Sequence, residues 1–225
     1  LGLFFQKAGT DSLGLINQVD PLPSSSRSNS IYDIFIDPNE VMWTGPFSFG
    51  VGYTDFRRKP FHLYNLADEE TMFFAKMINC FTDRDDENIW IGTEEGGLFC
   101  FNRYTRKFRQ YKPEPGNRNS VAGVNVKTLA RESDGNLWIG YYNSGLDYLD
   151  ITTGRIKHFN SEKSIPNSIS SNLLRSTILD DSEDLWIGTD KGVDFLKKGT
   201  TSFTHYNLNI EVLTLYKDYN NNIWA

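Results

Sequence analysis

The chain has 225 residues, of which 39% are hydrophobic and 14% aromatic, and its formal net charge is -6. This length suffices for one well-buried domain or two small ones. The acidic balance argues against a nucleic-acid partner, because phosphate backbones repel a negatively charged chain. No apolar run approaches the length of a membrane span, so we expect no membrane contact within this chain.

Five tryptophans recur at a regular spacing along the chain. Intervals of 47, 48, 48 and 38 residues separate Trp43, Trp90, Trp138, Trp186 and Trp224. The sequence around them repeats as VMWTG, NIWIG, NLWIG, DLWIG and finally NIWA. A sustained period of this length indicates a repeat architecture.

Taken in chain order, each unit contains four short runs of strand-forming residues separated by turn signals. An apolar-rich run leads into a polar turn such as RDDE or ESDG, whose Asp and Gly residues suit a tight hairpin. The tryptophan run follows, then a glycine-containing loop and a third run such as GGLFCFN. A fourth run carries paired aromatic or apolar residues. No helical period competes with this pattern.

Four antiparallel strands of this length cannot bury both faces of their sheet alone, so the copies are expected to stack radially. The sequence therefore predicts an all-β fold, a β-propeller of four-stranded antiparallel blades with about five repeats. The tryptophans are expected to pack between neighbouring blades. The predicted ranges are a half-blade at 1–22, whole blades at 30–66, 77–112, 125–160 and 173–208, and a half-blade at 211–225.

The two half-blades leave the closure of the ring open. The opening LGLFFQ matches the third strand of a unit, whereas the closing VLTLYKDYNNNIWA supplies a first and a second strand. This arrangement permits a five-bladed ring closed by a composite blade. It equally permits a fragment of a larger ring.

The segments NLWIGYYNSGLDYLD and NIWIGTEEGGLFCFN, with Asn167-Ser168-Ile169-Ser170 before the next unit, resemble the two-component regulator propeller repeat. The first unit departs from this pattern, since WTGPFSFG replaces the usual WIGT. The resemblance implies the periplasmic sensor region of a hybrid two-component system, as in Bacteroidetes. In such receptors the propellers precede an immunoglobulin-like domain, a membrane helix and a histidine kinase, and they respond to oligosaccharides. It thus implies a periplasmic sensing module without a kinase of its own.

In a propeller, the loop from the second to the third strand and the connection between blades open on the same face. Loops on a rigid scaffold carry binding groups, and sugars favour aromatic faces with a few fixed polar groups. Tyr141 and Tyr142 stand where other units have threonine and are the first choice, although they can also be plain loop aromatics. The full set of candidate ligand contacts is Phe47, Glu94, Glu95, Tyr141, Tyr142, Asn143, Asp190 and Lys191.

The sequence offers little for catalysis. His158 and His205 share a repeat position on fourth strands, so we expect them at the outer edges of different blades, with a surface role and no shared metal. Most acidic residues recur in the hairpin turns, which marks them as turn formers, whereas a glycosidase pair near the axis would be unique. We therefore expect no enzyme activity, no metal and no cofactor.

Three functions stay open in order of preference. The first is a sensing module for an oligosaccharide, and the second is a structural or dimerising propeller without a small-molecule pocket. The third is a propeller glycosidase or lyase. The expected partner is accordingly an oligosaccharide or a second copy of the chain.

Overall fold

The structure, a computed structural model, describes residues 3–6, 13–16, 31–39, 41–46, 51–55, 58–64, 77–207 and 209–225. Within these ranges the chain forms strands and turns. None of the described residues belongs to a helix with the length and apolar character that crossing a membrane requires.

Four antiparallel sheets, which we call the first to fourth blades, each consist of four strands in sequence order. The first blade contains β3 (Ile31–Ile36), β4 (Val41–Pro46), β5 (Val51–Asp55) and β6 (Arg58–Tyr64). The second contains β7 (Met77–Asp83), β8 (Asn88–Glu94), β9 (Leu98–Asn102) and β10 (Phe108–Tyr111). The third contains β11 (Val126–Arg131), β12 (Leu137–Tyr141), β13 (Leu146–Leu149) and β14 (Ile156–Phe159). The fourth contains β15 (Leu174–Leu179), β16 (Leu185–Thr189), β17 (Gly192–Leu196) and β18 (Phe203–Asn207).

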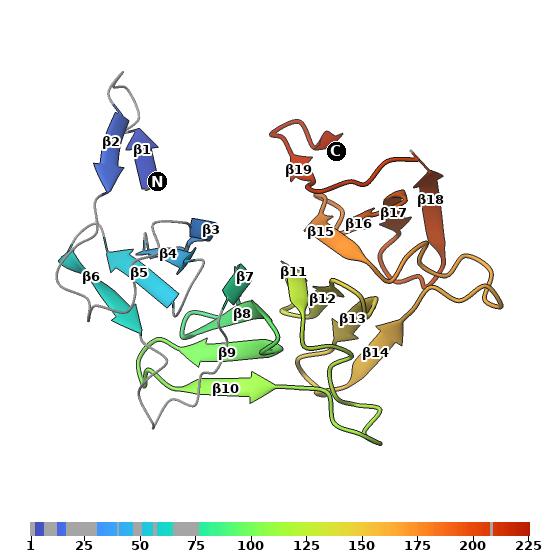
Figure 1. Cartoon of the computed structure of the whole chain (residues 1–225), viewed down its shortest axis with the longest axis horizontal. Coiled ribbons are helices and arrows are strands. Elements are labelled where there is room, and N and C mark those ends of the chain that lie inside the picture. The colour runs from blue at the N-terminus through green and yellow to red at the C-terminus, as the bar shows by residue number, and fades with distance from the viewer. Residues whose placement is uncertain are drawn as a thin grey trace.

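Two shorter sheets lie at the ends of the arc that the blades describe (Figure 1). They are β1 (Leu3–Gln6) with β2 (Leu13–Ile16), and β19 (Tyr216–Lys217) with β20 (Ile223–Trp224). The all-β propeller fold is confirmed. Among the described strands the two terminal sheets are not hydrogen-bonded to each other. The described strands therefore do not form a composite blade, and the predicted count of about five blades is not confirmed.

The tryptophans pack where one blade meets the next, as predicted. Trp43 lies in a buried cluster with Ile78 of the second blade. Trp90, which is 0% exposed, lies in the equivalent cluster with residues of the third blade, and Trp138 lies in the one shared with the fourth. The core is therefore a series of layers between blades, because each sheet buries a face only against its neighbour.

The glycine that follows each of the first four tryptophans by two residues lets the next blade or unit approach. A Cβ atom on Gly92 would lie 2.6 Å from Cγ1 of Val126, on the first strand of the third blade. On Gly188 it would lie 2.9 Å from the carbonyl oxygen of Val212, which begins the following unit. The WxG motif thus combines a large side chain that fills the join with a missing side chain that brings the backbones close.

A carboxylate six residues before the tryptophan ties the hairpin turn to the core. Asp180 accepts the backbone N–H groups of Ser182 and Asp184 with one oxygen, at 2.9 and 3.0 Å, and the indole N–H of Trp186 with the other, at 3.1 Å. The same indole bond joins Asp37 to Trp43, Glu132 to Trp138 and Asp218 to Trp224. The turn acids predicted from the repeat therefore also orient the tryptophans.

The second blade breaks this rule. Arg84 occupies the position of the acid, and its guanidinium carbon lies 5.2 Å from the centre of the Trp90 ring. The buried indole N–H of Trp90 has no hydrogen-bond partner among the described residues. Arg84 instead donates to the sulfur of Cys100 at 3.3 Å. Cys80 and Cys100 are both free.

Side chains on the innermost strands bind the backbone of the next blade. The Asp33 carboxylate accepts the N–H of Phe81 at 3.1 Å, the Thr128 hydroxyl accepts that of Thr177 at 2.9 Å, and the Ser176 hydroxyl accepts that of Leu215 at 3.1 Å. All three acceptors occupy one repeat position, beside a β-bulge in the first strand of each blade. Burial raises the pKa of Asp33 to about 6, against the opposing effect of its backbone hydrogen bonds.

Hydrophobic side chains are exposed at both ends of the arc. Ile31 is 36% exposed, whereas Leu174 at the same repeat position is 0% exposed between two blades. At the other end, Trp224 is 61% exposed, in contrast to the buried Trp90. These faces correspond to the ones that neighbouring blades cover elsewhere in the chain.

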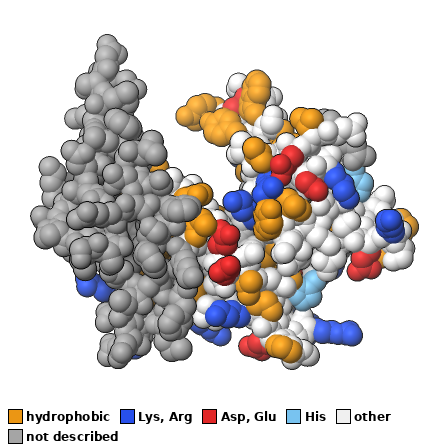
Figure 2. Space-filling view, viewed as in Figure 1, with side chains coloured by type: hydrophobic (Ala, Val, Ile, Leu, Met, Phe, Trp, Pro, Cys, Tyr) orange, Lys and Arg blue, Asp and Glu red, His pale blue; other side chains and the backbone are white. Residues whose placement is uncertain are grey.

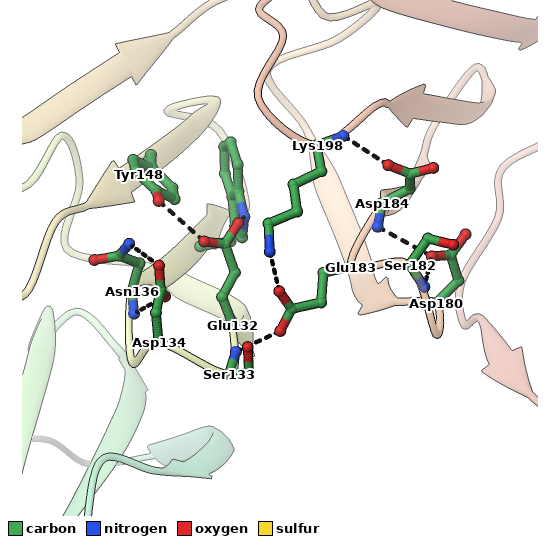
Figure 3. Close-up of polar contacts among 11 residues, drawn as sticks. Glu132, Ser133, Asp134, Asn136, Tyr148, Asp180, Ser182, Glu183, Asp184 and Lys198 are labelled. Atoms are coloured by element: carbon green, nitrogen blue, oxygen red, sulfur yellow. Dashed lines mark hydrogen bonds and ion pairs between the residues drawn. The ribbon is translucent and has the colours of Figure 1, made fainter.

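The buried Glu132 shows how much one turn carboxylate holds together (Figure 3). It accepts the indole N–H of Trp138 at 2.9 Å and the hydroxyl of Tyr148 at 3.0 Å. The next residue, Ser133, donates its backbone N–H to Glu183 of the fourth blade at 2.5 Å. Glu183 is also paired with Lys198, so the network links two blades.

Replacing Glu132 with leucine should therefore destabilise the fold by about 2 kcal/mol, because two partly buried donors lose their acceptor. Urea unfolding followed by fluorescence measures this change. The matched control is Asp218→Leu, which should cost less because the indole of Trp224 is exposed to water. An equal loss in both variants would contradict the account.

Candidate ligand-binding face

The two ends of each blade carry different connecting segments. Because consecutive strands are antiparallel, the loop between second and third strands and the connection to the next blade lie at one end, which we call the loop face. On it lie the loops 95–97, 142–145 and 190–191 and the connections 112–125 and 160–173. The turns between first and second strands lie at the opposite end, the turn face.

Backbone hydrogen bonds fix each loop to the connection that follows it. The N–H of Gly97 donates to the carbonyl of Val124 at 2.8 Å, and the N–H of Gly145 donates to that of Asn172 at 3.0 Å. Both glycines have positive φ, 81° and 75°, which suits residues without a Cβ atom. Main-chain bonds therefore hold these two loops against the connections that follow them.

Asn125 joins the loops of two neighbouring blades. Its side-chain oxygen accepts the N–H of Glu95 at 2.6 Å, and its carbonyl accepts the N–H of Tyr142 at 3.1 Å. Glu95 has φ of 62°, a conformation that is uncommon outside glycine. Two predicted ligand contacts, Glu95 and Tyr142, are thus attached to one residue.

Tyr142 presents a ring at this face. It is 42% exposed, and the guanidinium carbon of Arg175, from the fourth blade, lies 4.9 Å from the ring centre. Arg175 donates from Nε to Glu211 at 2.6 Å, so the cation is already paired. The tyrosine therefore has a supported position and an exposed surface.

Tyr141 has a different environment. It is 0% exposed, and its hydroxyl donates to the buried carboxylate of Asp147 at 2.7 Å. The threonines at its repeat position, Thr93 and Thr189, donate instead to carbonyls of their own loops. Burial, and then the charge of Asp147, raise the pKa of Tyr141. The side chain of Tyr141 is therefore engaged inside the third blade, beneath the surface on which Tyr142 is exposed.

The other candidate contacts are spread over the face. Asn143, Glu95, Asp190 and Lys191 are exposed, and Glu94 is half-buried. The ammonium group of Lys191 donates to the carbonyl of Ser170 at 2.7 Å. Phe47 lies outside the described residues. Over the middle of the side shown in Figure 2, acidic and basic side chains lie beside hydrophobic ones.

The two histidines on fourth strands are paired with buried aspartates. His158 contacts Asp147 through Nδ1 at 2.6 Å, and His205 contacts Asp194 at 2.7 Å. Each aspartate also accepts an N–H from the connection before its blade, from Ala122 in one case and Ser170 in the other. The histidines lie at outer strands as expected, but their buried partners were not predicted.

The surroundings of His158 favour the imidazolium form. Its Nδ1 faces the carboxylate of Asp147, and its Nε2 faces the carbonyl of Arg118 at 2.8 Å. Since both partners are acceptors, both ring nitrogens are best satisfied when protonated. Burial lowers the pKa of His158, but the two hydrogen bonds and the charge of Asp147 outweigh it and raise this pKa above 6.5.

The stabilising effect of His158 should therefore be complete below its ordinary pKa of 6.5 and decline as pH rises through the raised value. The free energy of unfolding, measured by urea titration across this range, checks the prediction. His158→Gln should lower stability most at acidic pH, with a gap that narrows in alkaline solution. A gap that is independent of pH would show that the imidazole acts only through packing.

The described residues contain no group of three or more His, Cys, Asp or Glu side chains that could hold a metal ion. Asp147, Asp194 and Glu132 are buried, and each is engaged in the hydrogen bonds described above.

Comparisons with known proteins agree with this fold. Over 88% of the chain, the structure matches the extracellular domain of a putative hybrid two-component system from B. thetaiotaomicron, with a TM-score of 0.74 and 25% identity. A second such extracellular domain from this organism matches 91% of the chain with a TM-score of 0.69 and 19% identity, a likeness of fold. No protein-family model matches the chain.

A sequence relative points the same way. A stretch of 96 residues, 42% of the chain, is 27% identical to "Histidine kinase P4" of Formosa agariphila and covers 7% of that protein. The chain spans about a quarter of the two solved extracellular domains, 27% and 26% of their lengths. The resemblance seen in the repeats is confirmed: the chain is a propeller similar to extracellular domains of hybrid two-component systems.

Proposed function

We propose that the chain is a ligand-sensing module in the periplasmic part of a hybrid two-component sensor, and that it recognises an oligosaccharide at the loop face. The observation that carries the sensor role is the match to the extracellular domain of a hybrid system, at 25% identity and a TM-score of 0.74. Such neighbours are parts of sensor systems, which favours binding over catalysis.

The loop face supports the choice of a saccharide. The exposed ring of Tyr142 offers a flat apolar surface of the kind on which sugars stack. On the same face, Asn143, Glu95 and Asp190 provide exposed hydrogen-bonding groups. Tyr141 contributes by holding the loop, through its bond to Asp147.

A thermal-shift screen of the chain against plant and host oligosaccharides tests this proposal. A ligand specific to the folded state raises its stability by about 2.7 kcal/mol at a hundredfold excess over Kd. Tyr142→Ala should abolish the shift. Tyr219→Ala is the matched control, because Tyr219 is fully exposed in the turn between β19 and β20 on the turn face, and it should keep the shift.

Loss of the shift in the Tyr219 variant would indicate that the binding site is not on the loop face. A cooperative melt that no oligosaccharide moves would contradict saccharide sensing by this chain. If the chain then formed a dimer in sedimentation, the second candidate, a dimerising propeller, would be favoured. The exposed Leu213, Tyr216 and Trp224 at the end of the arc are the observation behind this candidate.

A further inference from the structure

The outer edge of the second blade has an unusual charge for this acidic chain. Residues 103–118 contain six cations and one carboxylate, although the whole chain has a net charge of -6. Arg103 is used inside the fold, where it pairs with the buried Asp37 at 2.5 Å. The other five are exposed, namely Arg106, Lys107, Arg109, Lys112 and Arg118.

These five cations are available to a partner. Among the described residues, no carboxylate forms a salt bridge with any of them. Arg109 lies over the ring of Tyr111, with its guanidinium carbon 4.9 Å from the ring centre, and so stays at the surface. They belong to β10 and its flanking segments, and β10 is the outermost strand of its sheet. The cations therefore follow one extended edge.

Arg106 adopts a backbone conformation with positive φ, and the third blade has glycine at the equivalent position. Its N–H donates to the carbonyl of Asn102 at 2.9 Å, with φ of 57°. In the third blade the equivalent bond runs from Gly154 to Asp150 at 2.8 Å, with φ of 70°. A side chain in this region carries backbone strain. An arginine is thus present where glycine would suit the turn better, which points to a role for its charge.

At two further positions the second blade lacks an acidic side chain that other blades have. Arg84 occupies the position where Asp37, Glu132 and Asp180 bind their tryptophans. Asn102 caps the outer turn through its side-chain oxygen, as the charged Asp150 does in the third blade. Each change removes a negative charge while the blade keeps its strand order.

We infer that the outer edge of the second blade binds an anionic polysaccharide. A row of unpaired cations along the outermost strand and its two flanking segments is complementary to a linear chain with repeated negative groups. Tyr104, which is 73% exposed in the same turn as Arg106, adds an aromatic surface that suits a sugar ring better than a lipid headgroup or an acidic peptide. This inference rests on the proposed glycan-sensing function, but it concerns a different surface.

Binding is measured by calorimetry at low and physiological salt, with heparin as the sulfated probe, polygalacturonate as the carboxylated probe and dextran as the neutral one. We expect the intact chain to bind at least one charged probe, to lose affinity as salt rises, and to ignore dextran. The triple variant Arg106→Gly, Lys107→Gln, Arg109→Gln should lose affinity by about tenfold or more. The control Arg155→Gln, Lys157→Gln, on the outer edge of the third blade, should not.

Folding is checked separately with Arg106→Gly alone. Its melting temperature should equal or exceed that of the unchanged chain, because the substitution relieves strain. No binding of either charged probe at low salt would overturn the inference, as would equal losses in the triple variant and the control. Binding to phosphatidylglycerol vesicles without binding to the polysaccharides would also overturn the inference, and would indicate that the edge binds an anionic membrane surface. The two proposals are distinguished by a neutral oligosaccharide. If it still shifts the melting temperature of the triple variant, the loop-face site is intact, and any loss of anionic-polysaccharide binding concerns only the outer edge of the second blade.

Discussion

The joins between blades determine this structure, because a four-stranded sheet of such short strands buries its two faces only against neighbouring sheets. Each join combines a packed tryptophan with a glycine that admits the next backbone. At three of the joins a polar side chain also accepts an N–H group from the following blade or unit. At the join between the third and fourth blades these are Trp138, Gly140 and Thr128. The carboxylate of Glu132 then fixes the tryptophan to the turn.

Rigid joins leave the ends of the blades free to carry function. The loops at 95–97 and 142–145 are held by main-chain bonds to the connections that follow, so their side chains are not required for the fold. The outer edge of the second blade is equally independent, since its exposed cations contact no carboxylate in the described part of the chain. Two different binding surfaces are therefore compatible with one repeat.

The repeat made much of the fold predictable. Tryptophan and glycine perform the same physical task at each join, and the turn acid does so in every unit except the second blade, so these residues recur and reveal the period. Tyr141 was harder to place. Its strand, β12, is buried on both faces, so alternation of polar and apolar residues gives no sign of where the side chain points. Its partner, Asp147, lies on the next strand and becomes visible only when the register is known.

The pairing of the two histidines with buried aspartates has a signal in the sequence that the predictions above do not include. Asp147 and Asp194 occupy one repeat position, as do His158 and His205, and the strand register places each aspartate opposite its histidine. A polar pair that recurs on adjacent strands predicts a cross-strand contact. The strain at Arg106, in contrast, had no counterpart in the sequence pattern, because it depends on the backbone conformation of the turn.

Hydrogen exchange, followed by mass spectrometry with and without a bound oligosaccharide, tests the central claim most directly, since it shows which end of the propeller meets the ligand. The account predicts slower exchange in the loop-face segments 93–97, 141–145 and 189–192, with the turns at 84–88, 132–136 and 180–184 unchanged. Protection confined to those turns, or spread evenly over both ends, would contradict it.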